Sequence, residues 1–97
     1  MTGKQRAYLR ALANSIPVKY QIGKQGFEDK AFLQQLSEGL EKNELIKIKV
    51  LDNADLSPRE ASDAICTALG CEGVQVIGSK IVLYRESEKH KEIVLPR

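Results

Sequence analysis

The spacing of apolar residues changes back and forth along this chain, and that alternation limits the folds available to it. Apolar residues three and four positions apart predict helices in three segments, at about residues 3–14, 27–43 and 58–69. Alternating or short apolar runs predict strands in four segments, at about residues 18–22, 45–50, 74–77 and 81–84. The predicted order is therefore helix, strand, helix, strand, helix, strand, strand.

Local signals support several of these boundaries. Thr2 followed by Gln5 is a capping-box pattern at the first helix. Ser57-Pro58-Arg59-Glu60 is a strong helix start, with a capping serine, proline at the first position and glutamate at the third. Gly70 is placed to end that helix, and Gly78-Ser79-Lys80 predicts the turn of a hairpin.

Two strand–helix–strand units favour parallel pairing, whereas the final hairpin must be antiparallel. The sequence thus predicts an α/β fold of the α+β sandwich type, with a mixed four-stranded sheet and helices packed against it. A chain of 97 residues supports one modest core, so residues 1–97 are expected to form a single domain. Residues 86–97 form a charged tail in which Ile93, Val94 and Leu95 are candidates for docking.

Positive charge is concentrated at the beginning of the chain. The first 27 residues carry five basic side chains and no acidic one, although the net charge is only +2. This stretch leads into Gly23-Lys24-Gln25-Gly26, a turn that we call the GxxG turn, before the second predicted helix. Two glycines permit close approach to a ligand, the helix start offers free N–H groups, and lysine adds charge, a combination that suits a phosphate. Glu28 and Asp29 oppose phosphate binding, because their carboxylates compete with an anion at the same helix start.

Other classes of function find little support in the sequence. Cys66 and Cys71 have no neighbouring metal-binding partners, and the only histidine, His90, lies in the tail, so we expect neither metal nor cofactor. No clustered carboxylates, activated nucleophile or Walker-type loop indicates an enzyme. The absence of an apolar signal core or membrane-length run predicts a cytoplasmic protein.

Several motifs in order resemble one family. The motifs that carry the likeness are Lys4-Gln5-Arg6, the GxxG turn after Ile22, the strand Leu45 to Val50, and Val82-Leu83-Tyr84-Arg85. Together they make the chain similar to the CRM domain (chloroplast RNA splicing and ribosome maturation), in its stand-alone bacterial YhbY-like form. The likeness spans nearly the whole chain. It implies a fold like the C-terminal domain of translation initiation factor 3, no catalysis, and binding to ribosomal RNA in precursors of the large subunit.

The resemblance also implies where RNA would bind. The family's loop falls on the GxxG turn, where backbone amides, Lys24 and Gln25 would meet the RNA backbone. Basic side chains near it are expected to widen this surface, which then comprises Gly23, Lys24, Gln25, Gly26, Lys4, Arg6, Arg10 and Lys19. Further candidates lie on the predicted sheet, where a solvated face is the simpler interpretation: Lys47, Lys49, Lys80 and Arg85. Whether the first helix lies beside the turn is left open by the sequence.

Two alternatives accompany this hypothesis. Weak overall basicity also fits a protein-interaction module recruited to ribosomes by protein partners, including ribosomal proteins. An enzyme acting on RNA or nucleotides has no supporting constellation of residues. Neither a membrane nor DNA is an expected partner. Tyr20 could stack on a base, but its alternation with Val18 and Ile22 favours packing in the core.

Overall fold

The computed structural model describes residues 1–24 and 29–97 and has the predicted order of elements. These elements are α1 (Gly3–Ala13), β1 (Tyr20–Ile22), α2 (Lys30–Asn43), β2 (Leu45–Val50), α3 (Pro58–Leu69), β3 (Glu72–Ile77) and β4 (Lys80–Tyr84). The four strands form one sheet in the order β1-β2-β4-β3, with β1 parallel to β2 and the other two pairs antiparallel. The predicted mixed sheet is confirmed.

Capping explains most of the helix boundaries. The Thr2 and Ser57 capping boxes both form, and Gly70 ends α3 in the left-handed conformation at φ 64°. The start of α2 differs from the prediction, because Asp29 is not in the first turn. Its carboxylate accepts a hydrogen bond from the Ala31 N–H at 2.9 Å, so Asp29 caps a helix that begins at Lys30. Phe27 and Glu28, which were expected in this helix, lie outside the described residues.

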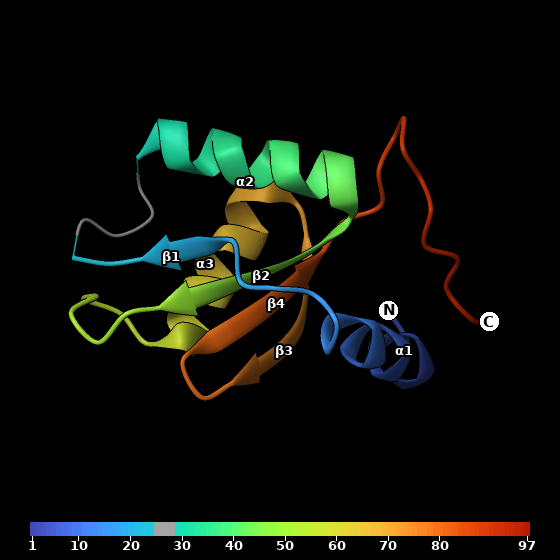
Figure 1. Cartoon of the computed structure of the whole chain (residues 1–97), viewed down its shortest axis with the longest axis horizontal. Coiled ribbons are helices and arrows are strands. Elements are labelled where there is room, and N and C mark those ends of the chain that lie inside the picture. Colours follow the sequence, from blue (N-terminus) through green and yellow to red (C-terminus); the bar gives the residue numbers. More distant parts are fainter. Residues whose placement is uncertain (25–28) are drawn as a thin grey trace.

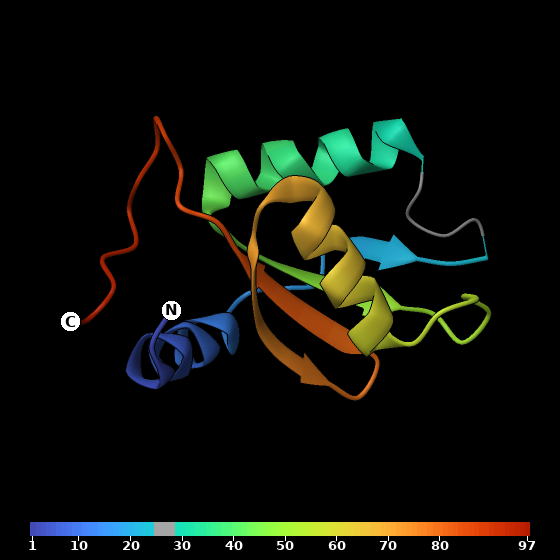
Figure 2. The same cartoon turned by 180° about the vertical axis from the view of Figure 1, so that it is seen from behind.

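The sheet carries helices on both faces, but they cover them unequally (Figures 1 and 2). On one face, α2 and α3 bury the main core, whose sheet members include Ile48, Ile81 and Leu83, each fully buried. On the other face, α1 covers only one end of the sheet, where Leu9 packs with a smaller group of buried side chains. This second core contains Leu9, Ala13, Leu45, Val74, Val82 and Tyr84.

The C-terminal tail docks along the same end of the molecule. Ile93 and Leu95 pack against the second core, while Val94 between them is exposed. Near the chain end, the Gln5 side chain in α1 donates a hydrogen bond to the Pro96 carbonyl at 3.1 Å. The expected docking is thus found for two of the three apolar residues.

Two carboxylates at the end of α2 hold the beginning of the tail. Glu44 is 1% exposed and accepts hydrogen bonds from the backbone N–H groups of Ser87, Glu92 and Ile93 at 2.7–2.9 Å. Glu41 accepts from the Ser87 hydroxyl at 2.6 Å and from two further backbone N–H groups. We call Glu41 and Glu44 the tail carboxylates. They anchor a charged segment that the sequence pattern left without a predicted structure.

Acid is expected to release this tail. Hydrogen bonds from Ser87, Glu88 and Lys89 lower the pKa of Glu41 from 4.5 to about 2. Burial alone would raise the pKa of Glu44, but the three backbone donors and the charge of Lys91 together lower it. Because both pKa values are depressed in the folded state, their stabilisation is present above pH 4.5 and fades as the pH falls toward about 2. The amide NMR signals of residues 87–93 should report that release.

The variant pair Glu41→Gln and Glu44→Gln should loosen the tail at neutral pH and remove most of its acid dependence. Glu88→Gln is the matched control, because the Glu88 side chain is exposed and only the backbone N–H of this residue bonds a tail carboxylate. Tail amides that stay unchanged from pH 5 to about pH 2 in the parent protein would contradict this account.

Candidate nucleic-acid interface

Strand register places one row of exposed side chains across the sheet face that α1 leaves uncovered. Lys49 on β2 pairs with Gln21 on β1 and with Lys80 on β4, and Lys80 pairs in turn with Ile77 on β3. Partners in register point to the same face. All four side chains are exposed. The neighbouring row contains Lys47, which pairs with the buried Val82, and Gln75.

Lys19 extends this surface at the β1 edge, where its N–H donates to the Lys47 carbonyl at 3.4 Å. We call the combined surface the open sheet face. It consists of Lys19, Gln21, Lys47, Lys49, Gln75, Ile77 and Lys80. Four of these seven residues are cations and none is an acid.

The charges on the open sheet face are not neutralised within the described part of the chain. There, the one ion pair joins Lys91 to Glu86 in the tail, at 2.7 Å. Lys49 and Lys80 lie directly opposite each other on antiparallel strands, an arrangement that is unfavourable for like charges. A surface of this kind attracts anions.

The GxxG turn follows directly from β1 at one end of the sheet, and the structure describes its first two residues, Gly23 and Lys24. The Leu51 N–H donates to the Ile22 carbonyl at 2.8 Å, which places the loop after β2 beside the turn. Lys24 is exposed. Gln25 and Gly26, the other predicted contacts, lie outside the described residues.

Neither backbone conformation nor packing requires glycine at position 23. Its φ is not in the left-handed region, and a Cβ atom there would meet Leu51 and Asn53 at ordinary contact distances of 3.5 and 3.6 Å. A glycine that the fold does not require is compatible with the close approach of a ligand. The exposed Asp52 in the neighbouring loop limits the positive potential at this end.

The basic residues of α1 do not lie beside Gly23 and Lys24, the two described residues of the GxxG turn. Helix α1 packs where β2 begins and β4 ends, whereas the turn follows the other end of β1 (Figure 1). The Arg6 Nε donates to the Gly73 carbonyl at 3.2 Å, at the β3 edge. Lys4 and Arg10 are exposed, and their spacing of six residues directs them roughly 120° apart around the helix. The open sheet face lies between α1 and the turn.

Arg85 contributes to the fold from the other side of the sheet. Its guanidinium donates to the Leu69 carbonyl at the end of α3, at 3.1 Å, and to both the carbonyl and the hydroxyl of Ser37 in α2, at 2.8 and 3.1 Å. The side chain thereby connects β4 with both helices of the main core. It lies apart from the lysines of the open sheet face, which project from the opposite side.

The aromatic side chains on the sheet are also committed to packing. Tyr20 packs against the main core, and Gly39 in α2 leaves it room, since a Cβ atom at position 39 would clash with the tyrosine hydroxyl. Tyr84 is 5% exposed and belongs to the second core. This arrangement agrees with the prediction that Tyr20 packs in the core and does not stack on a base.

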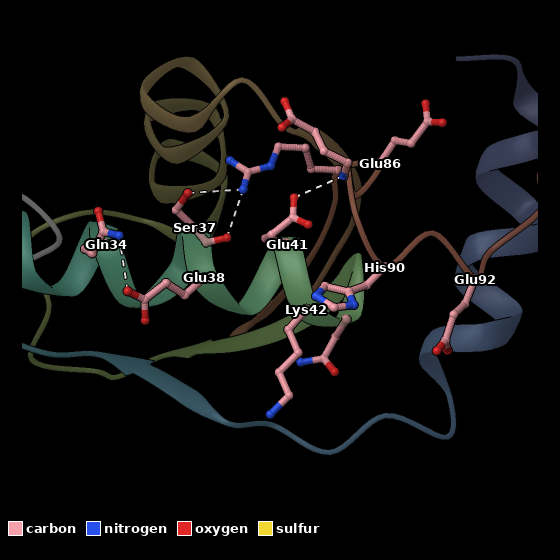
Figure 3. A pocket seen from close by; sticks show the side chains of 11 residues that line it. Gln34, Ser37, Glu38, Glu41, Lys42, Glu86, His90 and Glu92 are labelled. Atoms are coloured by element: carbon pink, nitrogen blue, oxygen red, sulfur yellow. Dashed lines mark hydrogen bonds between the residues drawn. The ribbon is translucent and has the colours of Figure 1, made fainter.

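Acidic side chains gather on a different part of the surface, along α2 and the start of the tail. A groove of about 1170 Å³ there is lined by five glutamates, Glu38, Glu41, Glu86, Glu88 and Glu92. Figure 3 labels four of them, together with Lys42 and His90. Charge is therefore segregated, with cations on the open sheet face and carboxylates beside the tail.

Within the described residues, no three histidine, cysteine, aspartate or glutamate side chains are grouped so that they could hold a metal ion. None of the helices described has the length and apolar character needed to cross a membrane. Cys66 and Cys71 are free, half-buried thiols, and both pack against the main core. Cysteines in such a position act as small hydrophobic residues.

The structure is that of a small α/β protein with one basic sheet face, and comparison with known proteins is more specific. Residues 1–85 match the family model of the CRS1 / YhbY (CRM) domain. The chain belongs to this family, as the ordered motifs predicted.

Individual relatives cover nearly the whole chain. The Bacillus subtilis "Probable RNA-binding protein YqeI" is 40% identical over 96 residues, which are 99% of each chain. A Haemophilus influenzae protein named "RNA-binding protein" is 33% identical over the full chain and 96% of its own length. The solution structure of a hypothetical Staphylococcus aureus protein, described as a candidate RNA-binding protein, matches with a TM-score of 0.81 and 47% identity over 99% of each chain. None of these descriptions names a reaction.

Proposed function

We propose that this protein is a non-catalytic RNA-binding protein of the cytoplasm, and that it binds ribosomal RNA in precursors of the large ribosomal subunit. The open sheet face carries the proposal, because four lysines lie on one surface without a carboxylate among them. Phosphate contacts by lysine and arginine supply most of the affinity in nonspecific nucleic-acid binding. The names of the two curated relatives support RNA as the polyanion.

The ribosomal part of the proposal has a different basis. It rests on the resemblance to the CRM family, in which ribosome maturation is an expected role. Crosslinking in living cells, with the contacts mapped to nucleotides, tests it directly. We expect crosslinks in large-subunit ribosomal RNA and co-migration with precursor particles in a gradient. Crosslinks confined to messenger or transfer RNA would contradict the ribosomal assignment and leave RNA binding intact.

The GxxG turn is proposed as one contact within this interface. Lys24 would neutralise a phosphate, while Gly23, Gln25 and Gly26 would allow the RNA backbone to approach. Lys4, Arg6 and Arg10 on α1 would extend the interface at the far end of the sheet. Lys19, Lys47, Lys49 and Lys80 would connect these two ends.

Lys24→Ala is expected to weaken binding to a large-subunit ribosomal RNA fragment and to make it less dependent on salt. One phosphate contact contributes about 0.7 to 0.9 to the slope of log affinity against log salt. Fluorescence anisotropy between about 50 and 200 mM salt should show that decrease. Lys89→Ala, a change to an exposed tail lysine, is the control and should preserve the slope. An identical slope in Lys24→Ala would remove the turn from the proposed interface.

The alternative is a protein-interaction module that ribosomal proteins recruit. The acidic groove beside the tail is the surface that favours it, because basic segments would find five carboxylates there. Purified protein separates the two functions. Salt-dependent affinity for protein-free RNA supports direct binding, whereas no measurable affinity at about 50 mM salt supports recruitment through proteins.

A further inference from the structure

The register of the open sheet face indicates more than general affinity for anions. Lys49 and Lys80 are exposed on neighbouring strands, and paired Cα atoms in antiparallel strands lie about 4.5 to 5.5 Å apart. Their flexible stems can bring two ammonium groups to adjacent phosphates of one strand. Such contacts also relieve the repulsion between the two lysines. The pair therefore suits a regularly spaced sugar–phosphate backbone.

The residues beside these lysines are suited to sugars. Gln21 and Ile77 lie at the two edges of the same row, which crosses four strands and so spans about 14 Å. A glutamine amide can donate to and accept from a ribose 2′-hydroxyl. Ile77 is 59% exposed, and its apolar surface can contact a ribose ring. Gln75 supplies a second amide in the neighbouring row.

The open sheet face, as described above, contains no aromatic side chain. Tyr20 and Tyr84 are packed in the two cores, Phe32 packs against the main core, and Tyr8 lies on α1. Proteins that bind single strands rely on aromatic side chains to stack unpaired bases. Double-helical RNA instead presents phosphates and 2′-hydroxyls across a wide, shallow minor groove.

We propose that the open sheet face binds the backbone of double-helical RNA, with Lys49 and Lys80 on adjacent phosphates and Gln21, Gln75 and Ile77 on riboses of the minor groove. This inference rests on the proposed RNA-binding function and names the form of RNA that the sheet recognises. It makes recognition dependent on helix shape and independent of base sequence.

The test compares two labelled probes by fluorescence anisotropy with the intact protein. One is an RNA hairpin of about 16 base pairs, and the other is an unstructured oligouridine strand with the same number of nucleotides. The parent protein is expected to bind the hairpin more tightly. A phosphate contact that contributes 0.7 to 0.9 to the slope of log affinity against log salt raises the affinity about 5-fold to 8-fold at about 0.1 M salt. Lys49→Gln with Lys80→Gln should therefore weaken hairpin binding about 25-fold to 60-fold.

A matched control removes the same charge elsewhere. Lys42→Gln with Lys89→Gln replaces two exposed lysines on the acidic side and should change hairpin affinity less than about 2-fold. Ile77→Ser should weaken binding by about 3-fold to 10-fold without altering the salt slope, because the contact it removes is apolar. Circular dichroism should show unchanged folding in each variant, since the replaced side chains are exposed. If the double lysine variant does not fold, Lys80→Gln alone replaces it.

The outcomes separate this inference from the proposed function. Hairpin preference together with the selective loss in the Lys49 and Lys80 variant supports double-helical recognition. Equal or tighter binding to oligouridine, or equal losses in the test and control variants, overturns it while RNA binding stands. If the parent protein binds neither probe nor any ribosomal RNA fragment, the proposed function itself fails.

Discussion

Arg85→Ala is expected to lower the free energy of unfolding by about 2 to 4 kcal/mol while leaving RNA affinity unchanged in the folded protein. The guanidinium donates three hydrogen bonds to groups of α2 and α3, and truncation leaves those acceptors without their charged partner. Urea unfolding followed by circular dichroism measures the first quantity. Fluorescence anisotropy without urea, at a temperature well below the melting point, measures the RNA affinity.

Arg85→Lys is the informative companion to this variant. Lysine keeps the charge but cannot form the planar fork that serves Leu69 and Ser37 together. It should therefore restore only part of the lost stability. If Arg85→Ala were as stable as the parent protein and had a shallower salt slope for RNA, Arg85 would instead be an RNA contact, as the sequence allowed.

The sequence predicted the order and type of every element because local signals and periodicity agreed. Two capping boxes, the proline after Ser57 and the glycine at position 70 all act where the pattern placed them. The exceptions are small shifts of element boundaries. Strand β1 begins at Tyr20, later than predicted. Helix α2 also begins later than predicted, because the Asp29 side chain bonds the Ala31 N–H and caps the helix.

Other features depended on contacts between residues far apart in the chain. The tail carboxylates act on backbone groups more than 40 residues away, and neither residue differs in type from the exposed Glu38 in α2. Burial of Glu44 therefore has no signature in the sequence. Arg85 is a similar case, because a basic residue after a strand is expected to be solvated until the middle of α2 and the end of α3 are placed beside it.

The candidate interface was predicted in composition but not in arrangement. The acid-free opening segment pointed to α1 and the GxxG turn, yet the sheet separates them. Lys47, Lys49 and Lys80, which were read first as a solvated face, occupy the space between. Gln21 and Ile77 were not singled out, although their alternation with core residues already placed them on the face away from the main core. Only the register of four strands shows that they share a row with the lysines.

The triple change Lys24→Gln, Lys49→Gln and Lys80→Gln is expected to weaken binding to a structured ribosomal RNA fragment about 100-fold to 500-fold at about 0.1 M salt. All three positions lie toward one end of the sheet: the Leu51 N–H bonds the Ile22 carbonyl beside the turn, and the Val50 N–H bonds the Ser79 carbonyl. If one RNA segment contacts the turn and the sheet together, the losses should be additive, and the salt slope should fall by about 2 to 3.

The control variant removes the same charge from the other side of the molecule and should have little effect on RNA affinity. It combines Lys42→Gln, Lys89→Gln and Lys91→Gln. Affinity no weaker than that of the Lys49 and Lys80 variant would instead mean that the turn and the sheet do not contact the same RNA segment.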